Sequence, residues 1–199
     1  WGGALRLRKQ FVQKFNGSEF SNDQRNNIIS GSRNIEISDV TDRDQGYVLF
    51  KYSNRTSTGI AGSNSTFADT DFPLFRFADV HLMYAECAVR GASNASLSQA
   101  TTYINLLRER ANNGSSIANI SQSNLTLDFI LDERSRELHW EGHRRQDLIR
   151  FNKFTGGTYN WAWKGNGING IALPQHMKIF PLHPATLASN PNLTQNPGY

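Results

Sequence analysis

Two adjacent segments with helical periodicity constrain the fold of this chain more than any other feature of its sequence. In residues 73–91 and again in residues 97–111, apolar side chains recur at spacings of three and four, the repeat of an amphipathic helix. The predicted inward faces are Phe77, Val80, Tyr84 and Ala88 in the first helix, and Leu97, Ala100, Ile104, Leu107 and Ala111 in the second. Residues 91–96 form so short a link that the two helices are expected to run antiparallel, as a hairpin.

Other segments extend this mainly helical prediction. Further helices are expected at residues 5–15, 127–140, 143–151 and 184–188. Short strands are expected at residues 35–37 and 47–52, where apolar runs interrupt a polar region. The predicted fold class is mainly α, with tetratricopeptide-like helical hairpins, a loop-rich irregular remainder and a few short strands. The full tetratricopeptide repeat signature is absent.

Composition divides the chain into three segments. Residues 1–72 are rich in Asn, Ser, Asp, Gly and Thr and are expected to be loops with one helix and short strands. Residues 73–151 are expected to form the helical hairpin scaffold, and residues 152–199 an irregular C-terminal segment. A length of 199 residues suits one or at most two domains.

The charge balance excludes a dedicated nucleic-acid-binding protein. The chain has 21 Lys and Arg against 17 Asp and Glu, a net charge of +4 that lacks the density such proteins carry. The single cysteine, Cys87, can form no disulfide within the chain, and its helical context predicts a small core residue. No apolar run reaches the roughly 18 residues that a transmembrane helix needs.

Residues 132–150 form the most charged stretch, in which five acidic and five basic side chains cancel. A basic RNA-binding surface or a catalytic carboxylate pair would be the functional interpretation. We favour an internal ion network that joins helices, because phosphate binding requires uncompensated positive charge. Helical spacing predicts ion pairs from Arg136 to Asp132 and to Glu133.

Two motifs imitate known sites without meeting their requirements. His139 and His143 lie four residues apart, but a zinc-protease helix needs Glu directly after the first His, and Trp140 stands there. The glycines of residues 165–170 match G-x-G-x-x-G, yet no strand precedes them and no helix follows. We therefore expect structural or surface histidines and an ordinary loop.

Asp69 and Asp71 lie where the polar region meets the first helix of the hairpin. Two carboxylates with an intervening carbonyl suit Ca²⁺, although they fill only part of its roughly six to eight coordination positions. Turn or N-cap carboxylates are the alternative interpretation. The pattern leaves both open.

Tyr159, Trp161 and Trp163 alternate in a segment that we expect to be extended, which would place the three rings on one face. Flat rings flanked by amide side chains can hold sugar rings, but the same rings would serve equally as a core under a loop. The chain contains no G-x-S-x-G, P-loop or C-x-x-C motif, and no carboxylate pair suited to glycoside hydrolysis can be nominated. The residues alone therefore nominate no catalytic site and leave both interpretations of the rings open.

Several segments together resemble the SusD/RagB family of outer-membrane nutrient-binding lipoproteins. In chain order they are residues 72–79 (FPLFRFAD), 82–86 (LMYAE), 104–111 (INLLRERA), 130–150, 190–193 (NPNL) and 195–199 (QNPGY). Each piece alone is weakly specific, but the shared order makes the resemblance strong from Phe72 to Tyr199. Because family members are much longer, the resemblance implies that this chain is the C-terminal portion of a larger protein. The sequence of these segments most resembles that of the starch-binding members.

The resemblance implies a function that the residues alone do not. Family members bind oligosaccharide at the cell surface without catalysis, deliver it to a SusC-like TonB-dependent transporter, and are held in the outer membrane by a lipidated cysteine, expected before Trp1. Starch or maltooligosaccharide is the implied ligand, and Ca²⁺ at Asp69 and Asp71 becomes the favoured interpretation. The candidate ligand contacts are Tyr159, Trp161, Trp163 and Trp1. The alternative is a protein-interaction scaffold that contacts the transporter without touching sugar.

Overall fold

The structure, a computed structural model, describes residues 5–199 and divides the chain into two compact units. The larger unit is Trp1–Arg144, and the C-terminal unit is Arg145–Tyr199. In the part that is described, most regular structure is helical and the sheet has two short strands, which confirms the mainly α fold class. Trp1, one of the predicted sugar contacts, lies outside the described residues.

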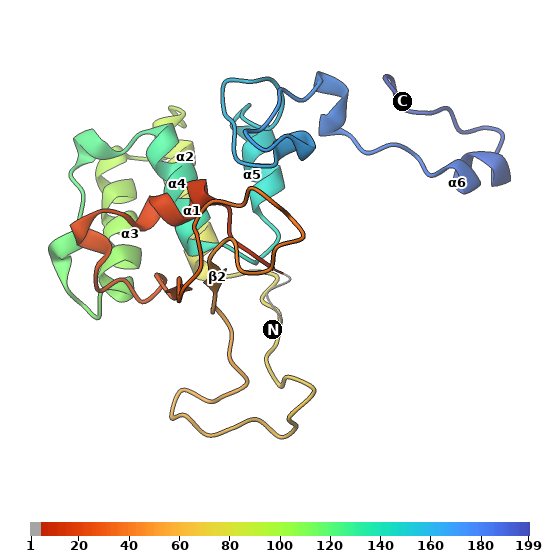
Figure 1. Cartoon of the computed structure of the whole chain (residues 1–199). Coiled ribbons are helices and arrows are strands. Elements are labelled where there is room, and N and C mark those ends of the chain that lie inside the picture. Colours follow the sequence, from red (N-terminus) through yellow and green to blue (C-terminus); the bar gives the residue numbers. More distant parts are fainter. Residues whose placement is uncertain (1–4) are drawn as a thin grey trace. The chain divides into compact units, whose positions relative to one another are not determined.

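Three helices form the centre of the larger unit (Figure 1): α2 (Phe77–Val89), α3 (Leu97–Ala111) and α4 (Leu127–Glu137). α2 packs against both α3 and α4. α2 ends before Gly91, whose φ of +84° is a conformation that glycine adopts without strain. α3 begins at Ser96, whose side chain accepts a hydrogen bond of 3.1 Å from the Gln99 amide. The predicted helical hairpin is confirmed.

The buried face of α2 differs from the predicted one. Phe77 and Val80 are 75% and 48% exposed, whereas Ala88 is buried as predicted, together with Leu82 and two further alanines. Small side chains there let the two helices approach closely, so the larger apolar residues remain outside. The predicted core position of Cys87 is wrong for the same reason. It lies four residues after exposed Met83, on the same outer face, and is itself exposed.

α3 buries its predicted face except at Leu97, which is the first residue of the helix and is 39% exposed. In α3 the buried residues include Ala100, Ile104, Leu107 and Ala111. In α4, Ile130, Leu131 and Arg134 are buried, as is Leu138 just beyond it. α4 ends earlier than predicted, because Trp140 and Gly142 adopt φ values of +62° and +81° that a right-handed helix cannot contain.

The first part of the larger unit is loop-rich, as predicted, but its short elements are shifted. The first helix is only α1 (Lys9–Val12), continued by a 3₁₀ turn, instead of spanning residues 5–15. β1 (Ile28–Ile29) pairs antiparallel with β2 (Val48–Leu49). The strand predicted at residues 35–37 does not form. Ile37 is buried, so the apolar residues of this run pack against the core instead of pairing with another strand.

The C-terminal unit is irregular apart from short helices. It contains all but the first residue of α5 (Arg144–Arg150), a 3₁₀ turn at Lys164–Asn166 and α6 (Pro184–Ser189). Gly156 and Leu173 form an isolated antiparallel bridge that closes the segment between them. The segment with the G-x-G-x-x-G pattern is a loop, as predicted, with no strand before it.

Candidate functional site

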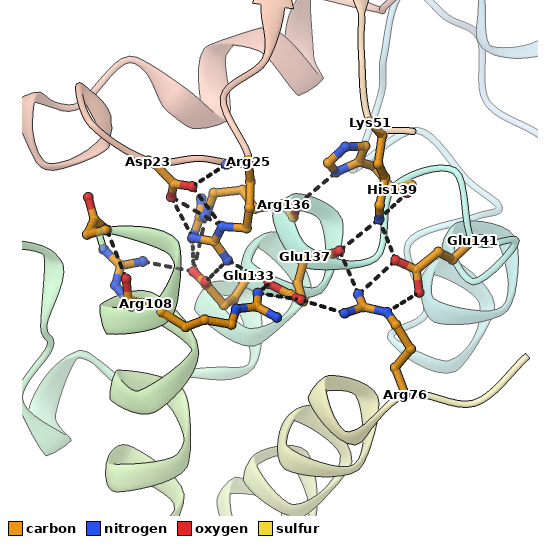
Figure 2. Close-up of polar contacts among 12 residues, drawn as sticks. Asp23, Arg25, Lys51, Arg76, Arg108, Glu133, Arg136, Glu137, His139 and Glu141 are labelled. Carbon is orange, nitrogen blue, oxygen red and sulfur yellow. Dashed lines mark hydrogen bonds and ion pairs between the residues drawn. The ribbon is translucent and has the colours of Figure 1, made fainter. Parts of the chain in front are cut away.

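α4 and the turn after it carry a row of three buried glutamates, Glu133, Glu137 and Glu141 (Figure 2). They are spaced by four residues, so the two within the helix lie one above the other on a single face. Basic side chains from before, within and after the hairpin converge on this row. We call the whole set the glutamate network: Asp23, Arg25, Lys51, Arg76, Arg108, Arg110, Glu133, Arg136, Glu137 and Glu141.

Glu133 is the fully buried centre of the glutamate network. Its carboxylate lies 2.7 Å from Arg25, 2.8 Å from Arg108 and 2.7 Å from Arg136. Burial alone would raise the pKa of Glu133, but the charges of Arg136, Arg25 and Arg108 outweigh burial and hold the pKa far below its usual range. The carboxylate is therefore ionised at every physiological pH.

Glu137 and Glu141 continue the row toward the turn that follows α4. Arg76 contacts both, at 3.0 Å from Glu137 and 2.7 Å from Glu141. The Lys51 ammonium donates to the Glu137 carbonyl at 3.1 Å, to the His139 carbonyl at 2.7 Å, and to the Glu141 carboxylate. These contacts fix the turn that carries Trp140 in its left-handed conformation.

The glutamate network confirms the predicted internal ion network within and beyond residues 132–150. Its arginines pair with carboxylates of the chain, so it does not form an uncompensated phosphate-binding surface. The Glu133 to Arg136 pair is confirmed. The predicted Asp132 to Arg136 pair is wrong, because Arg136 turns toward Glu133 and the Lys14 carbonyl while Asp132 pairs with the Lys14 ammonium. Carboxylates held ionised in this way are poor proton donors for catalysis.

His139 has a structural position, as predicted. Its Nδ1 lies 2.8 Å from the Arg136 carbonyl, and its ring packs edge-on against Phe11 with centroids 5.4 Å apart. Burial and, to a smaller extent, the charge of Lys51 lower the pKa of His139 to about 4. In residues 5–199 no group of three or more His, Cys, Asp or Glu side chains is placed to hold a metal ion.

Asp69 and Asp71 lie in the exposed loop that joins β2 to α2. The Asp69 carboxylate accepts two hydrogen bonds of 2.6 Å from Ser63, one from its amide and one from its hydroxyl. The Asp69 amide in turn donates to the Asn54 side chain at 2.8 Å. Asp69 thus shapes the loop, which is the turn role that the sequence offered as the alternative to calcium.

The structure brings Tyr159 and Trp161 together in the C-terminal unit. Their ring centroids lie 6.2 Å apart, and Trp161 lies 6.5 Å from Phe154. Tyr159, Trp161 and Trp163 are all partly exposed rather than buried in a core. The segment is not extended as predicted, because Ala162 and Trp163 form a turn and Trp163, directly before the 3₁₀ turn, is left-handed with φ of +66°. We call residues 154–171 the aromatic loop.

Sequence reasoning missed two aromatic residues of this unit. The Arg145 guanidinium lies 4.9 Å from the centre of the Phe154 ring and 4.0 Å from the centre of the Phe180 ring. Arg145 also donates to the carbonyls of Met177 and Lys178. Long separations in the sequence hide this grouping, since no spacing pattern links residues 145, 154 and 180. The result is a series of partly exposed rings with polar groups between them, which suits a ligand with both apolar and hydroxyl-bearing faces.

Comparison with known proteins identifies the family. The sequence profile described as the SusD family matches residues 6–199. The chain belongs to the SusD family. It is 36% identical over 172 residues to the starch-binding protein SusD of Bacteroides thetaiotaomicron, covering 86% of this chain and 29% of that protein. SusD-like protein P38 of Formosa agariphila is 37% identical over 136 residues, which are 66% of this chain and 25% of that protein. The chain thus spans less than a third of these relatives.

Solved structures show the same fold. A SusD superfamily protein from Bacteroides vulgatus superimposes with a TM-score of 0.64 at 22% identity, over 98% of this chain and 39% of the other. One from Parabacteroides distasonis gives 0.62 at 22% identity, over 98% and 42%. Among the residues described, none of the helices is long and apolar enough to cross a membrane.

Proposed function

We propose that this SusD family protein binds glycan without catalysing a reaction, and that its ligand is starch or maltooligosaccharide. The observation that carries the proposal is the 36% identity, over most of this chain, with a protein named for starch binding. The partly exposed ring pair of Tyr159 and Trp161 supports it, because flat rings can stack on the apolar faces of sugar rings while nearby amides bind hydroxyls.

In this proposal the aromatic loop contributes sugar contacts through Tyr159, Trp161 and Trp163, and Trp1 contributes another. Asp69 and Asp71 are proposed ligands of Ca²⁺, with any further ligands supplied by carbonyls or water. Asp71 is exposed, and the Ser63 contacts of Asp69 would have to be shared with the ion or exchanged for it.

The protein is further proposed to act on the outer surface of the outer membrane, held by a lipid anchor outside this chain. It would pass bound oligosaccharide to a SusC-like TonB-dependent transporter. The second candidate function is a protein-interaction scaffold that contacts the transporter without touching sugar. The exposed apolar residues around Phe75 and Phe77, at 93% and 75%, favour this alternative for the larger unit.

Replacement of Trp161 by Ala tests the glycan proposal. We expect Trp161→Ala to weaken binding of maltoheptaose by at least tenfold, measured by isothermal titration calorimetry on the 199-residue chain, because a stacking surface is removed. Phe67→Ala is the matched control, since Phe67 is an aromatic residue 74% exposed in a loop of the other unit. Equal affinity of both variants and the original chain would contradict a sugar role for Trp161. No detectable binding of any glucan by the original chain would contradict the proposed function.

A further inference from the structure

Lys164 is buried inside the aromatic loop without an acidic acceptor. Its side chain is 1% exposed, although a lysine is almost never fully buried unless its charge is paired. The ammonium donates to the Gly156 carbonyl at 2.9 Å, to the Tyr159 carbonyl at 2.8 Å, and to Asn160 Oδ1 at 3.3 Å. These three uncharged acceptors match the three N–H donors of the ammonium group. The loop itself therefore solvates the buried charge.

The backbone of Lys164 forms hydrogen bonds with residues on both sides of it in the aromatic loop. Its amide donates to the Trp161 carbonyl at 3.1 Å, and its carbonyl accepts from the Ile171 amide at 3.0 Å and the Gly167 amide at 3.3 Å. Gly170 permits this closure: its φ is +78°, and a Cβ there would lie 2.5 Å from the Trp161 carbonyl oxygen. Lys164 thus connects the first part of the aromatic loop, at Gly156 and Tyr159, with its last part, at Ile171.

The contacts of Lys164 converge on the two rings proposed to hold sugar. Nζ lies 4.9 Å from the centre of the Trp161 ring, and the shortest of its three hydrogen bonds is to the backbone of Tyr159. Burial of the ammonium is costly and lowers the pKa of Lys164. A methionine would fill the same space without a charge to bury. A lysine at this position is explained if the loop needs a particular backbone path from Gly156 to Trp161.

We infer that Lys164 is a positioning residue for glycan binding, which holds the Tyr159 and Trp161 rings in the orientation that a sugar requires. This inference rests on the proposed function. Lys164 is not itself a sugar contact, because its ammonium is buried and its donors are all used within the loop.

The test replaces Lys164 by Met in the 199-residue chain and measures binding of maltoheptaose by calorimetry. We expect at least a tenfold loss of affinity, together with a change in the near-ultraviolet circular dichroism of the tryptophans, while far-ultraviolet dichroism is unchanged. The matched control is Lys178→Met, because Lys178 donates to Asn152 at 3.2 Å, outside the aromatic loop. Retention of full affinity by Lys164→Met, with Trp161→Ala defective, would overturn the inference and leave the proposed function intact.

A second measurement uses the original chain and does not depend on the folding of a variant. The Ile171 and Gly167 amides both donate to the Lys164 carbonyl, so they report the closure of the loop. We expect saturating maltoheptaose to slow hydrogen exchange at these two amides at least tenfold. A purely structural lysine would not couple to the ligand, so unchanged exchange with sugar bound would overturn the inference. Absence of any glucan binding would overturn the inference and the proposed function together.

Discussion

Lys51, which is partly buried, and Lys164, which is fully buried, show how the same charged group is accommodated in different ways. The Lys51 ammonium binds two carbonyls and the carboxylate of Glu141, so a charge of opposite sign offsets part of the cost of burial. The Lys164 ammonium binds two carbonyls and an amide oxygen, which offset that cost through dipoles alone. Burial lowers the pKa of both. The glutamate network therefore accounts for the burial of the Lys51 charge. The burial of the Lys164 charge is accounted for only by the loop that Lys164 closes.

His139 gives a prediction for the dependence of stability on pH. Its folded-state pKa is about 4, below the value of 6.5 that applies in the unfolded chain. The unfolded state therefore binds a proton first as pH falls, so stability is full above pH 6.5 and is lost as pH decreases toward 4. Between pH 7 and pH 5, we expect His139 to account for a loss of about 1–2 kcal/mol in the free energy of unfolding.

The measurement is urea unfolding at both pH values, with His139→Asn as the comparison. Asn cannot take up a proton but offers an amide donor near the position of Nδ1, where the Arg136 carbonyl lies. The variant should lose less stability than the original chain on acidification. An identical loss in both would show that other groups, such as His81, whose pKa burial also lowers, dominate this range.

At the scale of the element, α4 shows how far sequence reasoning reaches. The balance of charges in residues 132–150 was enough to predict an ion network instead of a nucleic-acid surface. The local pair of Glu133 with Arg136 was predictable, but the distant partners were not, because Arg25 and Glu133 are separated by 108 positions and no local spacing relates them. Most of the buried face of α3 was predictable, because apolar residues recur there at spacings of three and four. In α2 the prediction included buried Ala88 but also Phe77 and Val80, which are exposed, and it missed the buried Ala78 and Ala85.

Neutralising Glu133 should lower the free energy of unfolding much more than neutralising its neighbour Asp132. Glu133→Gln leaves Arg25, Arg108 and Arg136 without their shared carboxylate in a buried setting, and we expect a loss of about 3–5 kcal/mol in the free energy of unfolding. Asp132→Asn is the matched control, since the Asp132 side chain is 39% exposed and should cost less than about 1 kcal/mol. Chemical denaturation of both variants at pH 7 provides the comparison. Similar losses would mean that Glu133 contributes no more than a surface acid.

At the scale of the whole molecule, the aromatic loop was recognised from the sequence in part. Alternation from residue 159 to 163 identified the Tyr159 and Trp161 pair, but Phe154 joins them across a turn and Phe180 is related to it only through Arg145. Lys164 carried no signal, since its buried position depends on how the loop closes. Such groupings arise from tertiary structure, which periodicity does not encode.

The exposed apolar segment before and within the start of α2 leads to a prediction about association. Leu74, Phe75 and Phe77 are 72%, 93% and 75% exposed, which favours contact with another surface. We expect the chain to self-associate with rising concentration, and Phe75→Ser to reduce this in sedimentation velocity while changing the free energy of unfolding by less than about 0.5 kcal/mol. Phe67→Ser, at an exposed phenylalanine outside the segment, should have a smaller effect. A monomeric original chain at all concentrations would contradict the prediction.

The glutamate network also has a consequence for the time course of folding. During synthesis, Arg25, Arg76 and Arg108 emerge before the acidic residues of α4 that they contact. Until that helix is made, Arg25 has its neighbour Asp23 but not Glu133, and Arg76 and Arg108 lack the α4 carboxylates that they contact in the folded protein. The larger unit should therefore complete its core only after residue 141 has left the ribosome, in a late step that depends on contacts between distant parts of the chain.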